Sequence, residues 1–169
     1  VTEMTEVQTD RYARQILHWG AEKQLLIEKS SLLIAGVGGL GATVSQLLVR
    51  AGIGKLYLVD DGHLDWPDLN RQTLYGEKDI GRAKLPLAKE RLQQINSAAE
   101  IIELSGRIDD AFQIPPAVAG VADCLDNYRS RFILYQALSN GTYFVHGGLN
   151  GDHGQVLTLL AGESQSFDE

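Results

Sequence analysis

The stretch LLIAGVGGLG at residues 32–41 passes directly from an apolar run into a cluster of glycines. An apolar run, then glycines, then apolar residues at helical spacing indicates a buried strand, a loop and a helix. A turn that only reversed the chain would need one glycine, whereas this loop contains Gly36, Gly38, Gly39 and Gly41. We therefore expect another molecule to approach the backbone of this loop closely.

Strands and helices alternate along the rest of the chain. The hydrophobic pattern predicts further strands at residues 55–60, 100–105, 121–125, 143–147 and 155–160, and further helices at residues 10–29, 84–96 and 128–139. The first of these helices is expected to break at Gly20. Such alternation is typical of a mostly parallel sheet with helices on both faces. We predict a Rossmann-like α/β fold.

Several connecting segments lack this periodicity. Residues 1–9 are expected to be a disordered lead-in to one domain over residues 10–169. The polar connection from 61 to about 81 is long enough to suggest a function. Residues 109–120 include two prolines and are expected to be irregular, and residues 146–154 (HGGLNGDHG) to form a glycine-rich turn between two strands.

The composition argues against several classes of partner. The net charge is −7 and the isoelectric point is about 5.1, so non-specific attraction to nucleic acid or to an anionic membrane is not expected. No apolar run approaches the roughly 20 residues that cross a bilayer, and the acidic start VTEMTEVQTD does not resemble a signal peptide. We expect a cytoplasmic protein. Because Cys124 is the only cysteine, a disulfide within the chain is impossible.

The glycine loop and Asp60 together predict a nucleotide site. In a parallel sheet, the first strand-to-helix turn is the usual phosphate site, because the N–H groups at the start of the helix face the ligand. Asp60 ends the second strand, where a carboxylate accepts hydrogen bonds from both ribose hydroxyls. The alternative is that the glycines merely allow the helix to pack on the strand. The same pattern serves both NAD and ATP.

Charged residues further along the chain favour ATP. Asn70, Arg71 and Lys84 follow Asp60 and are expected at the same edge of the sheet. Two cations exceed what a pyrophosphate bridge needs, but they suit a triphosphate whose outer groups accumulate charge during attack at the α-phosphorus. Asp126 follows the fourth predicted strand, where its carboxylate could hold Mg²⁺ against the phosphates.

Each of these residues has a simpler interpretation. Arg71 and Lys84 could be solvated surface charges, which is common for arginine and lysine. Asp126 could serve merely as the cap of the helix that begins near Tyr128. Cys124 is expected to be a core residue, and the four histidines show no spacing typical of metal ligands.

Five motifs carry a resemblance to a known family. RYARQI, GVGGLG, LVDDGHLDWPDLNRQTL, IGRAK and DCLDN occur in the order and spacing of the MoeB/ThiF/HesA family, the bacterial relatives of ubiquitin-activating enzymes. The resemblance extends from about Arg11 to Leu160. It implies an adenylyltransferase that uses ATP and Mg²⁺ to activate the C-terminal glycine carboxylate of a ubiquitin-like or sulfur-carrier protein ending in Gly-Gly, with release of pyrophosphate.

The resemblance also implies roles for individual residues. The four glycines would line the phosphates, Asp60 would hold the ribose, and Asp126 would coordinate Mg²⁺. Asn70, Arg71 and Lys84 would contact the phosphates. Arg14 would reach the phosphates of a neighbouring subunit, which implies a homodimer with shared sites; the residue by itself would only indicate an exposed charge on a helix.

The chain also departs from the family pattern. Gly62 stands where the family usually has a second acid, and Asp68 replaces an asparagine, which adds negative charge near the expected phosphates. The paired CxxC motifs that bind a structural zinc in the family do not occur in this chain. The domain is therefore expected to lack the family's C-terminal part, and one interpretation is that the chain is an inactive fragment.

Two other functions fit parts of the sequence. An NAD-dependent oxidoreductase would explain the glycine loop and Asp60, but it would give no joint role to Arg71, Lys84 and Asp126. A non-catalytic nucleotide-binding or dimerisation module would fit the missing C-terminal part. The carrier protein and its pathway, whether molybdopterin synthesis, thiamine synthesis or another, are not specified by the sequence.

Overall fold

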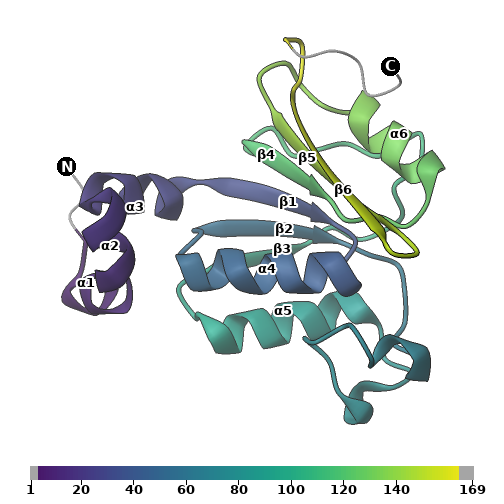
Figure 1. Ribbon diagram of the computed structural model, residues 1–169, viewed down its shortest axis with the longest axis horizontal. Coiled ribbons are helices and arrows are strands. Elements are labelled where there is room, and N and C mark those ends of the chain that lie inside the picture. Colours follow the sequence, from purple (N-terminus) through teal and green to yellow (C-terminus); the bar gives the residue numbers. More distant parts are fainter. Residues whose placement is uncertain (1–3, 164–169) are drawn as a thin grey trace.

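A mostly parallel sheet forms the centre of the protein. The computed structural model describes residues 4–163, and these contain six strands in the order β3-β2-β1-β4-β5-β6 (Figure 1). The strands are β1 (Ser31–Ala35), β2 (Lys55–Val59), β3 (Glu100–Glu103), β4 (Gly120–Asp123), β5 (Tyr143–Asn150) and β6 (His153–Leu160). All neighbouring pairs are parallel except β5 and β6, which form an antiparallel hairpin.

The order of the strands reverses direction between β1 and β4. The chain first builds outward through β2 and β3, and then returns to place β4 on the other side of β1. In sheets of this kind the loops that leave the two central strands diverge at their carboxyl ends and open a crevice for a ligand. Here these loops are the glycine loop after β1 and residues 124–127 after β4.

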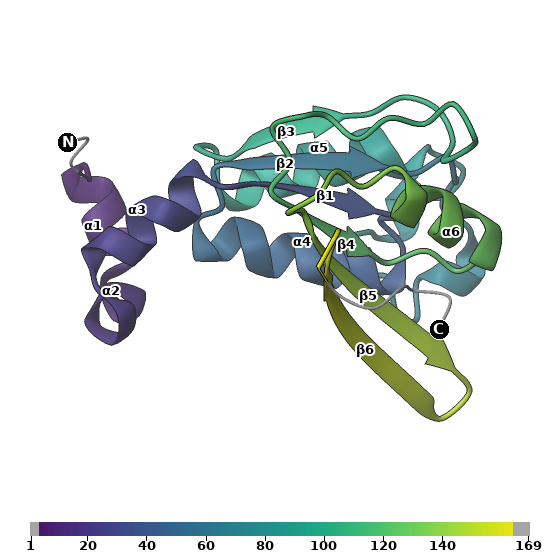
Figure 2. The ribbon, with the colours of Figure 1, turned by 90° about the horizontal axis from the view of Figure 1, so that it is seen from above.

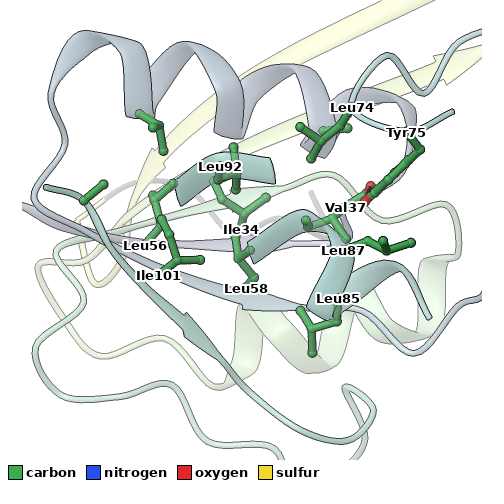
Figure 3. Packing of buried hydrophobic residues seen from close by; sticks show 14 of the residues in the cluster. Ile34, Val37, Leu56, Leu58, Leu74, Tyr75, Leu85, Leu87, Leu92 and Ile101 are labelled. Atoms are coloured by element: carbon green, nitrogen blue, oxygen red, sulfur yellow. Dashed lines mark hydrogen bonds between the residues drawn. The ribbon is translucent and has the colours of Figure 1, made fainter. Parts of the chain in front are cut away.

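Helices and loops cover both faces of the sheet, which confirms the predicted fold class. On one face α4 (Gly39–Ala51) and α5 (Lys84–Ile95) pack against β1, β2 and β3 (Figures 1 and 3). On the other face α6 (Tyr128–Gln136) packs with apolar residues of the irregular segment 104–119. The core between the sheet and helices α4 and α5 is fully buried at its largest side chains, which include Ile34, Leu56, Leu58, Leu87 and Leu92.

The N-terminal residues differ from the prediction. Residues 1–9 were expected to be disordered, yet Glu6–Arg11 form helix α1; residues 1–3 lie outside the described part. Thr5 starts this helix with a capping box, because its side chain and that of Gln8 each accept a backbone hydrogen bond. The chain continues through α2 (Ala13–Trp19) and α3 (Ala21–Lys29), separated at Gly20 as predicted.

The long connection between β2 and α5 is well packed. It contains two short 3₁₀ turns, η1 (Trp66–Asp68) and η2 (Glu77–Asp79). Leu74 and Tyr75 enter the core beside Val37 of the glycine loop, and the Tyr75 hydroxyl donates to the Val37 carbonyl over 2.7 Å (Figure 3). The connection is thereby fixed to the loop that follows β1.

The glycine-rich stretch at residues 146–154 is mostly strand. It was predicted as a turn, but β5 continues to Asn150, β6 begins at His153, and only Gly151 and Asp152 turn the chain. The cross-strand hydrogen bonds of the hairpin override the weak strand preference of the glycines. Within residues 4–163, no helix combines the length and apolar character that crossing a membrane requires.

Candidate nucleotide site

The four glycines of the loop have two different structural roles. Gly36 has a φ of +86°, a backbone conformation that residues with a side chain rarely adopt. A Cβ atom on Gly41 would lie 1.8 Å from the Gly36 carbonyl oxygen, so helix α4 can pack this closely only without a side chain there. Gly36 and Gly41 are thus required by the fold of the loop itself.

Gly38 and Gly39 are not required in that way. A Cβ atom on Gly39 would meet nothing closer than the Arg71 side chain at 3.6 Å, and one on Gly38 nothing closer than the Gln72 amide at 3.7 Å. No side chain of the described residues caps α4, whose first turn begins here. These two glycines leave the start of the helix bare beside a cation, which is the arrangement that binds phosphate.

Asp60 links the glycine loop to the connection after β2. One carboxylate oxygen accepts from the Val37 N–H over 2.8 Å and the other accepts from the Gly62 N–H over 2.7 Å. Each oxygen has a second lone pair and can still accept a hydroxyl proton. A Cβ atom on Gly62 would lie 3.0 Å from the Asp60 carboxylate and 3.6 Å from the Lys84 side chain. Because Gly62 has no side chain, both groups can lie close to its backbone.

Asp68 holds both predicted phosphate-binding cations. Its carboxylate lies 3.1 Å from the Lys84 ammonium and 3.5 Å from the Arg71 guanidinium. Burial alone would raise the pKa of Asp68, but the Asp65 N–H and the charges of Lys84 and Arg71 outweigh burial and lower it. The acid that departs from the family pattern therefore stays ionised and positions the cations.

Arg71 and Lys84 differ in exposure, but both side chains are anchored. The side chain of Lys84 is only 13% exposed. That of Arg71 is 59% exposed, but its guanidinium also donates to the Pro67 carbonyl over 2.8 Å and to the Asn70 side chain over 3.1 Å. Asn70 thus lies with the other members of the predicted set. The nearby Gln72 is buried, and its Oε1 has no hydrogen-bond partner among the described residues.

Asp126 lies in the loop between β4 and α6, and its side chain is exposed. The helix after it is capped by Asn127, whose side chain accepts from the Ser130 N–H over 2.9 Å, so capping does not account for Asp126. The preceding Leu125 lies against Gly36, where a Cβ atom would be 3.6 Å from the Leu125 side chain. The residues 4–163 hold no cluster of three or more metal-ligating side chains. One exposed carboxylate nevertheless fits Mg²⁺, which is often held by one or two carboxylates plus substrate phosphates.

Arg14 is the one predicted site residue that lies elsewhere. It is exposed on α2, and α1–α3 project from the end of the sheet opposite the glycine loop (Figure 2). The structure does not bring Arg14 to the phosphate loop of its own chain.

A buried polar network lies at the end of β4 and in β5, and it was not predicted from the sequence. Asp123 at the end of β4 pairs with His146 of β5, and both are nearly inaccessible. The two residues are direct neighbours across the parallel strands. The alternation of buried and exposed positions along the two strands was the only signal that could have revealed the pair.

Cys124 directly follows β4 and is half-buried, so it packs against the core without being one of its fully buried residues. Burial raises the pKa of its thiol to about 12, the Asp123 charge adds to the shift and Arg131 opposes it. The thiol is therefore protonated at neutral pH and a poor nucleophile.

Comparison with known proteins identifies the family. The model of the ThiF family matches residues 12–169. This chain belongs to the ThiF family. It is 31% identical over 163 residues to the sulfur carrier protein ThiS adenylyltransferase of Bacillus subtilis, with 92% of this chain and 48% of that protein covered. It is 32% identical over 160 residues to the sulfur carrier protein adenylyltransferase of Thermus thermophilus, with 92% and 59% covered. The ThiF-family chain thus spans about half the length of these relatives.

Solved structures share the fold. PaaA superimposes with a TM-score of 0.83 at 21% identity, covering 99% of this chain and 60% of that one. E. coli MccB with ATP superimposes with a TM-score of 0.70 at 26% identity, covering 82% of this chain and 44% of that one. At 21% identity, the similarity to PaaA supports only the fold of this ThiF-family chain.

Proposed function

We propose that this ThiF-family protein binds MgATP at the carboxyl edge of its sheet and adenylates the C-terminal glycine of a ubiquitin-like or sulfur-carrier protein. The observation that carries the proposal is that Asp68 pairs with both Arg71 and Lys84, and that Arg71 lies beside Gly39 of a loop in which Gly38 and Gly39 are not required by internal packing. The names of the sulfur-carrier adenylyltransferases among its relatives, and an MccB structure with ATP, support it.

The triphosphate is expected along the glycine loop. The N–H groups at the start of α4 would face its oxygens, Arg71 would lie beside Gly39, and Lys84 and Asn70 would complete the donor set. Asp126 would hold Mg²⁺, which supplies further positive charge against the phosphates. Two cations and a metal ion match a triphosphate better than the pyrophosphate of NAD.

The reaction requires no nucleophile from the protein. The carboxylate of the carrier is ionised at neutral pH and attacks the α-phosphorus of ATP. A new bond forms from the carboxylate oxygen to phosphorus, the bond from phosphorus to the bridging oxygen breaks, and pyrophosphate leaves. The protein has to align the two reactants and offset the charge on the leaving group, which Arg71 and Lys84 would do.

The nucleoside would extend from Asp60 toward β3. Asp60 would accept the ribose hydroxyls. The next residue, Asp61, pairs with Arg107, which lines an open hollow of about 400 Å³ together with Leu104 and Phe112. We place the base in this hollow, because it offers apolar side chains beside polar groups.

The complete site is expected to form in a homodimer. Because Arg14 lies far from the phosphate loop of its own chain, its proposed role at the phosphates requires a second subunit. The partner proteins would be carriers ending in Gly-Gly. We also propose that the protein acts in the cytoplasm, where ATP is available to it.

Pyrophosphate exchange tests this proposal. Labelled pyrophosphate should enter ATP in the presence of a carrier ending in Gly-Gly, and not with the same carrier lacking its last glycine. Lys84→Ala should lower the exchange rate at least tenfold, because a charge-assisted contact contributes about 1.5–3 kcal/mol. Lys78→Ala, an exposed lysine of the same connection, is the control and should have no effect. Equal exchange rates for Lys84→Ala and the wild type would refute the site.

A further inference from the structure

A buried network of charged and polar side chains converges on the peptide that precedes Asp126. Asp123 and His146 are 0% and 1% exposed, and the carboxylate lies 2.7 Å from Nδ1 of the ring. Arg131 of α6 is also buried, and its Nε lies 3.8 Å from the same carboxylate oxygen. Burying such groups is costly unless all of them are paired, so the network specifies one arrangement.

The network forms hydrogen bonds with both the backbone N–H and the backbone C=O of Leu125. The second oxygen of Asp123 accepts from the Leu125 N–H over 3.1 Å. The guanidinium of Arg131 donates to the Leu125 carbonyl through Nε over 3.1 Å and through Nη2. Leu125 is thereby held at its N–H and its C=O, and the next residue is Asp126.

We propose that Asp123, His146 and Arg131 are positioning residues that fix the Leu125 peptide so that the Asp126 carboxylate faces the Mg²⁺ of bound ATP. The inference rests on the proposed function. Side chains behind a metal ligand commonly set its orientation, and their loss typically weakens metal binding about 10- to 100-fold. None of the three touches the nucleotide in this arrangement.

The hydrogen bonds assign the proton on His146. Gln155 of β6 places its amide nitrogen 3.1 Å from Nε2 of the ring. A carboxylate only accepts hydrogen bonds, so Nδ1 carries the proton that is donated to Asp123, and Nε2 faces the Gln155 amide. The asparagine amide nitrogen occupies about the position of Nδ1, whereas that of glutamine corresponds to Nε2. His146→Asn should therefore preserve the network, and His146→Gln and His146→Leu should not.

The experiment measures the Mg²⁺ dependence of ATP binding by calorimetry. His146→Leu and His146→Gln should raise the half-saturating Mg²⁺ concentration about tenfold, leave ATP affinity without Mg²⁺ unchanged, and be rescued in His146→Asn. Arg131→Lys should raise the Mg²⁺ requirement in the same way, which covers the case that His146→Leu does not fold. His153→Leu is the matched control, because His153 forms an exposed pair with Asp152 in the same hairpin.

A second readout needs no ligand. The Leu125 amide should exchange with solvent at least tenfold faster in His146→Leu than in the wild type, while amides of β1 are unchanged. Unchanged Leu125 exchange, or an equal loss of ATP affinity with and without Mg²⁺, would overturn the positioning role.

Asp126→Asn separates the two levels of the proposal. If Asp126→Asn abolishes the Mg²⁺ dependence and His146→Leu does not alter it, the positioning role is refuted and the proposed function stands. If the wild type binds no ATP, both are refuted.

Discussion

At the scale of single residues, the glycine loop shows that one motif can combine two demands. Gly41 is bare because the Gly36 carbonyl occupies the space of a side chain, whereas Gly39 has ordinary space around it. The sequence shows four equivalent glycines, and only the three-dimensional arrangement separates the two that build the loop from the two that we expect to serve the ligand.

Alanine substitutions test this separation. Gly41→Ala should destabilise the protein by about 3 kcal/mol or more, since the loop and helix must move apart. Gly39→Ala should leave the melting temperature within a few degrees of the wild type but lower ATP affinity at least tenfold, because the methyl group occupies the phosphate surface. Thermal unfolding and calorimetry measure the two effects. Gly76→Ala, an exposed position with free space around it, is the control for both. Tight ATP binding by Gly39→Ala would contradict the division of roles.

At the scale of elements, the connection between β2 and α5 is held by a buried acid as well as by its apolar residues. Asp79 is 1% exposed, accepts from the Gly76 N–H over 3.0 Å, and pairs with Arg82 and Arg91, each at 3.2 Å. Burial by itself would raise the pKa of Asp79, but the Gly76 N–H and the two guanidinium groups outweigh it and lower the pKa. The segment that carries Arg71 is therefore fixed at a second point.

Asp79→Asn should lower the free energy of unfolding by about 2 kcal/mol at pH 7. Because the folded-state pKa is below the unfolded value of about 3.9, this contribution is present above that pH and disappears as the pH falls through the folded-state pKa. Denaturant unfolding from pH 7 to about pH 2 should show the difference between the two proteins constant above about pH 4 and shrinking below it. Asp110→Asn, which breaks an exposed pair with Arg129, should cost only a few tenths of a kcal/mol. A constant difference between wild type and Asp79→Asn at all pH values would contradict this account.

The elements themselves were largely predictable, for a local reason. The strands and helices follow from hydrophobic periodicity, which neighbouring residues carry by themselves. The pair of Asp123 and His146 was not predictable, because the two residues are 23 positions apart and meet only through strand pairing. The role of Asp68 depended in the same way on the fold of the connection. Helix α1 was missed although Thr5 and Gln8 have capping-box spacing, because the helix lacks an apolar face and its end is anchored by Tyr12, whose hydroxyl accepts from the Asn96 side chain.

At the scale of the whole molecule, the proposed site is divided between subunits. Arg14 lies on α2, which projects with α1 and α3 from the far end of the sheet, so its proposed role at the phosphates would require the phosphate loop of another copy. The remaining predicted residues belong to one chain. This division makes a specific form of complementation possible.

Mixing two inactive variants tests the shared site. Arg14→Ala should remove the arginine that one subunit contributes to the site of its neighbour. Lys84→Ala should remove the lysine from the site of the subunit that carries the substitution. A mixed dimer would contain one complete site, so an equimolar mixture after exchange of subunits should recover about a quarter of the wild-type pyrophosphate exchange. A mixture as inactive as either variant alone would contradict the shared site.

Recognition of a triphosphate by the glycine loop and its cations can be measured by calorimetry with a series of nucleotides. In the presence of Mg²⁺, ATP should bind at least 100-fold more tightly than AMP and more tightly than NAD, and this preference should fall by a factor of ten or more in both Arg71→Ala and Lys84→Ala. Equal affinities for ATP and AMP, tighter binding of NAD, or a preference for ATP that survives both substitutions would contradict the account.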